Sequence, residues 1–432
     1  MSWRESLSPV KMARVALVAP VEHAHAALRE VAASALVEMD LPALRADGPG
    51  QLEQAADAAV VSGPTAGWIG WIPRRDIAAL EARLIPIGAA VVPVARPRGV
   101  EPPTMLAGTG KPRMSRSLVE TYGTIPYADV DPSRLSGIAY VVMFGMMFGD
   151  VGHGAVLVVA GLLVRSGRIR ALRKYTKAWS FVVGGGLVSM VFGALYGEAF
   201  GPTGLIPVLW LDPLANPIPL MLTALVIGAI LLAGAYVIGT INRIREGGWG
   251  YALYTASGVA GSLLFVSVGL LAWGVLGGLA PVTVIAVVLA TSALVLLFIG
   301  FFVDAGGGAT GTMQAVIEVL DSVIRLGSNV VSFVRLAAFG LTHAALLTVV
   351  WQGTTALWAP DWRAGAAVLL FLVGNVVTFG LEALVAGIQA LRLEYYELFS
   401  RVFQSEGHPF RPWSPPLATG SGSNSTSERH PA

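Results

Sequence analysis

Two arginines lie within long apolar stretches of this sequence, where a charged side chain is costly. Arg335 lies near the middle of one such stretch, and Arg392 lies in the last one. An ionisable residue at the centre of a membrane-spanning helix costs at least ~2.5–3.5 kcal/mol and usually serves a function. Arg392 could instead extend its side chain to the membrane surface, as we expect for Arg325 and Arg401. Arg335 lies too deep for that explanation.

Polar side chains accompany Arg335 along its segment at helical spacing. Ser332, Ser328 and Asp321 precede it by 3, 7 and 14 residues. His343 follows it by 8 residues. All share roughly one face of a helix, so the pattern predicts a polar stripe on an otherwise apolar element. The histidine is equally consistent with a buried structural residue and with a group that relays protons.

The last apolar segment carries a second polar pattern. Glu382 lies ten residues before Arg392. If the two segments are antiparallel neighbours, Glu382 and His343 line one pathway, although Glu382 could also be a structural partner for an arginine. The motif GDVGHG holds two more ionisable residues, and we favour a role for them in satisfying backbone groups at a hairpin. The further possible contributors are Asn329, Gln389, Asp150 and His153.

Composition places the chain among membrane proteins. Of its 432 residues, 54% are hydrophobic and only 13% are charged, whereas soluble domains have about 25% charged residues. A net charge of +2 without a basic, aromatic patch argues against nucleic acid. There is no cysteine, and the six histidines show no metal-ligand spacing, so we expect no metal and no cofactor. The sequence GTGK (108–111) lacks the first glycine of a Walker A motif, so we expect no ATP hydrolysis by this chain itself.

The apolar segments predict a mainly α membrane protein with about eight transmembrane helices, of which the last two are long and tilted. Each segment is long enough to matter for a bilayer about 30 Å thick. The first is cut at 149–154 into two short helices if both chain ends lie on the same side. The segments are 136–166, 177–197, 216–242, 249–277, 281–303, 312–352 and 361–402.

The residues before the membrane part predict a small α/β lobe. RVALVAP (14–20), GWIGWIP (67–73) and AAVVPVARP (89–97) are typical of strands, and the sequences between them include two helical patterns. The tail after Trp413 is rich in Ser, Gly, Pro and Asn, which predicts disorder. We therefore expect four parts: a cytoplasmic domain over 1–115, a linker over 116–135, a transmembrane domain over 136–404, and a mostly disordered cytoplasmic tail over 405–432.

Basic loops indicate the orientation. RSGRIRALRK (165–174) and NRIREGG (242–248) are the most basic loops, so we expect both in the cytoplasm. No signal peptide pattern opens the sequence, so we expect the N-terminus in the cytoplasm as well. On this orientation, His343 and Glu382 lie toward the outside, and Asp321, Ser328 and Ser332 lie toward the cytoplasm.

Several long motifs resemble one family, subunit a (subunit I) of V-type and archaeal-type rotary ATPases. NVVSFVRLAAFGLTHAAL (329–346) resembles its arginine helix, and LEALVAGIQALRLEYYELF (381–399) resembles its last helix. FGMMFGDVGHG (144–154), FGALYGEAFG (192–201) and ETYGTIPYADVDPSRL (120–135) resemble earlier signatures in the same order. Family members carry a far longer cytoplasmic arm, so the resemblance implies a truncated N-terminal domain, with residues 40–65 in place of a coiled-coil insertion.

The resemblance implies a membrane stator subunit without a catalytic site. It would provide two half-channels for protons, and its arginines would face a rotating proteolipid ring. The ion-translocation residues would be Arg335, Arg392, Glu382, His343, Asp321, Ser328 and Ser332. The implied partners are the proteolipid ring, central-stalk and peripheral-stalk subunits and the lipid bilayer, and the implied location is a prokaryotic plasma membrane.

Two other classes of function remain open at the level of sequence. The same polar stripe would suit an independent carrier or channel, which needs no partner ring. A relative that has lost its coupling to a motor would serve as an interaction protein. Recovery of motor subunits with the chain would distinguish the first reading from these two.

Overall fold

The computed structural model describes residues 9–41, 51–97, 100–106, 115, 118–119, 121, 123–168, 170–403 and 407–415. Its contacts divide the chain into two units. One unit comprises residues 1–107, 124–127 and 407–432, and the other comprises 108–123 and 128–406. Parts of the predicted linker and the predicted tail beyond residue 415 lie outside the described residues.

The first unit is an antiparallel sheet flanked by helices, as the strand and helix patterns predict. Strands lie in the order β2-β4-β1-β5, and β3 pairs with β4. Along β1, alternate side chains (Val15, Leu17 and Ala19) are buried, because one face of the strand packs against the helices. The elements are β1 Met12–Pro20, η2 Val21–His23, α1 Ala24–Ser34, β2 Glu38–Met39, α2 Gln51–Asp57, β3 Val60–Ser62, β4 Thr65–Pro73, η3 Arg74–Asp76, α3 Ile77–Leu84, η4 Ile85–Ile87 and β5 Ala90–Val94.

The segment 407–415 belongs to this first unit, although the sequence placed it at the start of a mostly disordered tail. Trp413 is buried, and its amide donates to the carbonyl of Val37 at 2.7 Å. The amide of Arg411 donates to Glu38 at 2.7 Å. A tryptophan buries a large apolar area, which composition alone does not reveal when the surrounding residues are polar.

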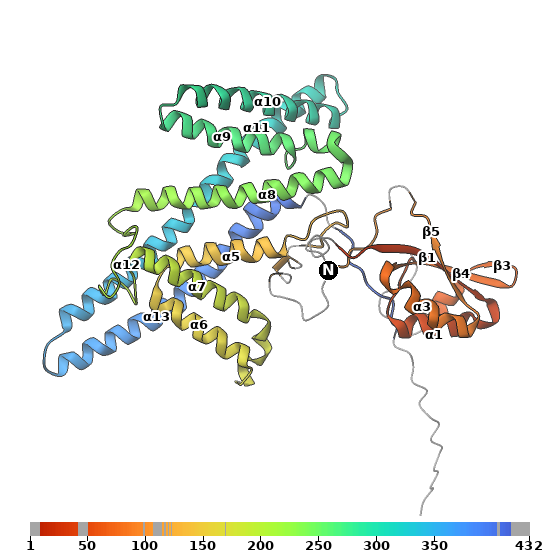
Figure 1. Cartoon of the computed structure of the whole chain (residues 1–432), viewed down its shortest axis with the longest axis horizontal. Helices are drawn as coiled ribbons and strands as arrows, with labels where there is room; N and C mark the ends of the chain where they lie inside the picture. The colour runs from red at the N-terminus through yellow and green to blue at the C-terminus, as the bar shows by residue number, and fades with distance from the viewer. Residues whose placement is uncertain are drawn as a thin grey trace, which may run out of the picture. The chain divides into compact units, whose positions relative to one another are not determined.

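The second unit consists of helices (Figure 1). The central ones are long and apolar, and the final turn before α14 is a π-helix. Its elements are α5 Ser133–Met147, α6 Val151–Ser166, η5 Arg170–Ala178, α7 Trp179–Tyr196, α8 Pro217–Tyr254, α9 Val259–Leu276, α10 Ala280–Asp304, α11 Gly308–Ser332, α12 Val334–Leu357, α13 Trp362–Leu393, η6 Glu394–Phe399 and α14 Ser400–Val402.

Six helical stretches among the described residues are long and apolar enough to cross a bilayer, which confirms a multi-pass membrane protein. Two shorter apolar helices, α5 and α6, lie on either side of the break that the motif GDVGHG predicts. The number of spans is seven if this pair crosses the bilayer once and eight if each helix crosses it, so the number eight stays a prediction.

The break before α6 has a clear physical origin. Asp150 is the N-cap of α6, and its carboxylate accepts a hydrogen bond from the amide of His153 at 2.8 Å. An N-cap of this kind satisfies one of the amides that a helix start leaves without a partner. Behind the break, α6 and α7 pack closely, because a Cβ on Gly154 would lie 2.7 Å from the carbonyl oxygen of Gly186.

The sequence predicted one helix over 312–352, and the structure has one helical stretch over 308–357. It contains a single irregular turn at Phe333, between α11 and α12 and two residues before Arg335. Phe333 is completely buried, and its ring occupies the space above Gly228 of α8. The absence of a side chain at Gly228 therefore lets this aromatic ring anchor the start of α12.

We predict that Gly228→Ala destabilises the protein, since a Cβ at this position would overlap the Phe333 ring. Overpacking of this kind costs about 1–3 kcal/mol. The measurement is thermal unfolding of the purified chain in detergent, followed by tryptophan fluorescence. Gly269→Ala on α9 is the matched control, because a Cβ there meets nothing within 4 Å. Equal melting temperatures for the two variants would contradict the proposed packing role.

Candidate functional site

Four of the seven candidate ion-translocation residues lie on two helices that pack against each other, α12 and α13. Both also contact α5, and α12 contacts α8 (Figure 1). Arg335 and His343 lie on α12, whereas Glu382 and Arg392 lie on α13. The polar groups form two clusters at different levels of this helix pair. His343 and Arg335 are 8 residues apart, which corresponds to about 12 Å along a helix.

The first cluster contains Arg335, Arg392 and Glu397, a glutamate that the sequence analysis did not identify as a candidate. Glu397 lies on the π-helical turn after α13 and is buried. Its carboxylate interacts with Ser332 and lies close enough to both Arg335 and Arg392 for a charge interaction. The structure thus brings together the two arginines and one of the predicted serines around an acidic group.

The two arginines differ in their surroundings. Arg335 is half-buried, and its Nη1 is buried without a hydrogen-bond partner among the described residues. Arg392 is exposed on this chain. Neither forms an ion pair within 4.0 Å with any carboxylate of the described residues. A guanidinium in an apolar bundle normally pairs with an anion, so Arg335 has unused capacity for one.

Glu394 is a second acidic residue on the π-helical turn. It is completely buried beside Ser136 and Tyr140 of α5. Both glutamates follow Arg392 within five residues, inside an otherwise apolar segment. Their position in the sequence could have identified them as candidates, because an ionisable residue within a membrane segment usually has a function.

The residues predicted to line the cytoplasmic pathway, Asp321, Ser328 and Ser332, all lie on α11 and differ in their surroundings. Asp321 pairs with Arg325 one turn later on an exposed face of α11. Ser328 is exposed. Asn329, with its amide oriented to satisfy both neighbours, donates to the carbonyl of Arg325 at 3.1 Å and accepts from Arg401 at 2.9 Å. Helix α11, which carries the predicted residues, is joined to α12 by the irregular turn at Phe333.

The histidine cluster joins three elements. His343 Nδ1 donates to Glu382 Oε2, so the structure brings together the two residues that the antiparallel arrangement predicted. His153 of α6 lies beside His343, with ring centroids 5.6 Å apart. On its other side, His153 Nε2 lies 3.1 Å from the side-chain oxygen of Asn375. The aromatic rings of Phe148, Phe200 and Phe379 enclose the pair.

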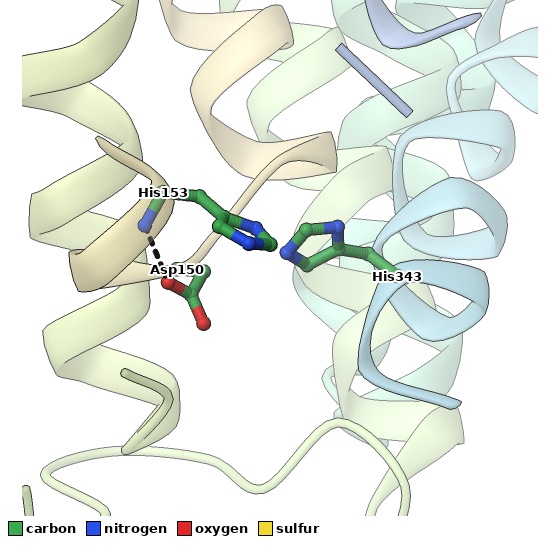
Figure 2. Close-up of side chains that lie close together, drawn as sticks. All are labelled: Asp150, His153 and His343. Atoms are coloured by element: carbon green, nitrogen blue, oxygen red, sulfur yellow. Dashed lines mark hydrogen bonds between the residues drawn. The ribbon is translucent and has the colours of Figure 1, made fainter. Parts of the chain in front are cut away.

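Asp150 lies next to the two histidines, and all three side chains are buried (Figure 2). Besides capping α6, its carboxylate accepts from the amides of Phe200 and Gly201 at 3.0 and 2.9 Å. These bonds support the structural role that the sequence favoured for Asp150. Glu198, buried in the loop after α7, lies close enough to Asp150 and Glu382 for charge interactions and extends the acidic cluster.

Gln389 lies on α13 between the two clusters. Its side-chain oxygen is buried without a hydrogen-bond partner among the described residues. Together the side chains of α12 and α13 provide a permanent cation at one level and proton-exchanging groups at the other. Histidine and glutamate can bind and release protons, whereas arginine keeps its charge.

Known proteins share these helices. A model of the V-type ATPase 116 kDa subunit family matches residues 64–204 and 311–415, together more than half of the chain. The A-type ATP synthase subunit I of Thermococcus kodakarensis is 26% identical over 365 residues, which cover 80% of this chain and 53% of that protein. The subunit I of Archaeoglobus fulgidus is 27% identical over 402 residues, which cover 80% of this chain and 58% of that protein.

One relative matches a shorter part of this chain at a higher sequence identity. The V-type ATP synthase subunit I 2 of Treponema pallidum is 41% identical over 88 residues, which cover 20% of this chain and 19% of that protein. The chain spans about half the length of the curated archaeal relatives that it matches over most of its own length.

We predict that Asp150→Ala destabilises the protein more than the loss of an ordinary helix cap. The substitution leaves three backbone amides without their acceptor, and each buried unsatisfied group costs about 1–3 kcal/mol. Asp361→Ala is the matched control, because this exposed N-cap of α13 accepts from a single amide. Thermal unfolding of the two variants in detergent gives the comparison. A melting temperature for Asp150→Ala at or above that of Asp361→Ala would argue against the structural role.

Proposed function

Because this chain belongs to the V-type ATPase 116 kDa subunit family, we propose that it is a membrane subunit of a rotary ATPase. In this role Arg335 and Arg392 face a rotating ring of small membrane subunits, each with one carboxylate. The chain provides the fixed half of the ion pathway and has no catalytic site of its own.

The proposal rests on one observation: Arg335 lacks an ion-pair partner among the described residues. Its guanidinium has a buried nitrogen without a hydrogen-bond partner among the described residues, and Glu397 lies near it without forming an ion pair. A buried charge normally pairs with an opposite charge. A carboxylate that arrives from a neighbouring ring would supply that pair and then leave again, which a permanent buried salt bridge would prevent.

The chemistry of such a cycle follows from elementary electrostatics. A ring carboxylate that faces lipid holds its proton, since burial disfavours the charged form. Near Arg335 the positive charge favours the carboxylate, and the proton is released. The same charge repels protons and so prevents a direct leak between the two sides of the membrane.

Two groups of residues would connect the arginines to water. His343 and Glu382, with Asp150, His153 and Glu198 beside them, would form the pathway toward the outside. Asp321, Ser328 and Ser332 would form the pathway toward the cytoplasm, with Asn329 and Gln389 as further contributors. The basic loops place both termini of the chain in the cytoplasm on this proposal, within a prokaryotic plasma membrane.

The proposed partners are the proteolipid ring and the central-stalk and peripheral-stalk subunits of the ATPase. Isolation of the full chain in mild detergent, followed by mass spectrometry, tests this assembly directly. Recovery with a small proteolipid and ATPase subunits supports the proposal. Recovery of the chain alone, from membranes without ATP-dependent pumping, would refute it in favour of a carrier or an uncoupled relative.

We predict that Arg335→Ala abolishes ATP-dependent proton pumping in vesicles while assembly of the complex is retained. The reason is that a ring carboxylate would no longer meet a cation that releases its proton. Arg363→Ala is the matched control, since this exposed arginine lies at the start of α13, away from both clusters. Pumping by the Arg335→Ala complex at the rate of the Arg363→Ala complex would remove Arg335 from the mechanism.

A further inference from the structure

The two buried histidines present unprotonated nitrogens to each other. Asn375 donates its amide hydrogen to the carbonyl of Phe371 at 2.9 Å, which fixes its side-chain oxygen toward His153. An amide oxygen only accepts hydrogen bonds, so His153 carries its proton on Nε2 and a lone pair on Nδ1. Glu382 acts in the same way on His343, whose proton lies on Nδ1 and whose lone pair lies on Nε2.

Neither lone pair has a partner. His153 Nδ1 and His343 Nε2 are both buried and without a hydrogen bond within the described part of the chain. The carboxylate of Asp150 lies beside them (Figure 2). One possible ligand atom from each of the three residues lies within 4.8 Å of the other two. Asp150 Oδ2 accepts only one hydrogen bond, so it keeps a free lone pair.

The surroundings of this group are strongly acidic. Besides Asp150, the carboxylates of Glu382 and Glu198 are close by. Among the residues that the structure describes, no lysine or arginine forms an ion pair with any of the three carboxylates. Electron-pair donors from three residues therefore lie close together, and the two histidine nitrogens among them have no hydrogen-bond donor within the described part of the chain. Buried acceptors left in that state cost free energy.

We propose that His153 Nδ1, His343 Nε2 and Asp150 Oδ2 form a binding site for a zinc-like transition-metal ion. Imidazole nitrogens suit zinc and its neighbours, whereas magnesium and calcium prefer oxygen ligands alone. Three protein ligands with a fourth position open to water is a common arrangement for zinc. The divalent charge would offset the acidic surroundings.

The hydrogen bonds of the other ring nitrogen of each histidine also fit a metal site. Metal-bound histidines usually donate their other ring hydrogen to a carboxylate or a carbonyl oxygen, which orients the ring. Glu382 and the side-chain oxygen of Asn375 already hold these positions. With zinc–nitrogen bonds of about 2.0–2.1 Å, tetrahedral ligand atoms lie about 3.3 Å apart.

Sequence spacing could not reveal this site. His153 and Asp150 belong to the start of α6, and His343 belongs to α12. The absence of a metal-ligand spacing among the six histidines therefore gave the opposite expectation. Only the packing of α6 and its N-cap against α12 and α13 creates the group.

The site has a consequence for transport that rests on the proposed function. A bound metal would occupy the nitrogen lone pairs of both histidines, so neither ring could accept a proton from the outside pathway. Zinc would then act as a reversible block of that pathway. Its binding, however, is a property of this chain alone and does not require the ring or the soluble motor subunits.

The test is a titration of the purified, chelator-treated full chain in detergent with zinc chloride, followed by calorimetry and metal analysis. We expect one zinc per chain, and at least a tenfold loss of affinity for His153→Ala and for His343→Ala. Glu382→Gln should weaken binding by about 10–100-fold, the usual effect of a changed carboxylate behind a metal ligand. His25→Ala, an exposed histidine of the first unit, is the matched control and should bind zinc unchanged.

Zinc-edge X-ray absorption of the wild-type chain makes the result independent of how the variants fold. Two imidazole nitrogens and oxygen at about 2.0–2.2 Å are expected. No zinc bound, or zinc lost in His25→Ala but kept in His343→Ala, would overturn the metal site and mean that a water or a shared proton joins the two rings. Proton pumping by a chain that binds no zinc would overturn this inference alone. Zinc binding by a chain that assembles with no motor would overturn the proposed function alone.

Discussion

An ionised guanidinium within an apolar helix bundle needs an anion or a route to water, and the architecture around Arg335 depends on this constraint. Among the residues that the structure describes, no carboxylate forms an ion pair with Arg335. The protein holds Arg335 at the start of α12, with the buried ring of Phe333 packed against Gly228, and leaves one guanidinium nitrogen without a partner among the described residues. Glu397 is near enough to moderate the charge without cancelling it. On the proposed function, this arrangement would let a mobile carboxylate approach Arg335 and leave again.

The positions of the candidate functional groups depend on irregular turns in the helices as well as on the helices themselves. The break at Asp150 turns the chain back so that α6 begins beside α12, and the break at Phe333 starts α12 just before Arg335. The π-helical turn after α13 places Glu394 and Glu397 inside the bundle. Such turns occur often at functional sites, because they shift the side chains relative to an α-helix. Each break needs its own local support, from an N-cap, an aromatic ring or a tight contact.

The sequence predicted the features that depend on periodicity and depth. The antiparallel order of the last two segments was enough to place Glu382 near His343, and the motif GDVGHG was enough to divide the first segment in two. Features that depend on three-dimensional packing were beyond its reach. Helical counting placed Ser332 and Arg335 on one helix, but it did not reveal the irregular turn at Phe333 between them. The group of Asp150 and the two histidines joins distant segments, so no spacing rule could find it.

The lengths of the two shorter helices constrain the membrane itself. α5 has 15 residues and α6 has 16 residues, so at 1.5 Å per residue they are about 22 and 24 Å long. The hydrocarbon core of a bilayer is about 30 Å thick. If α5 and α6 lie within the bilayer, helices of this length would thin the lipid around them or leave their ends below the level of the headgroups. The thickness of the surrounding lipid would then determine how far water must penetrate to reach Asp150, so membrane composition would tune access to the histidine cluster.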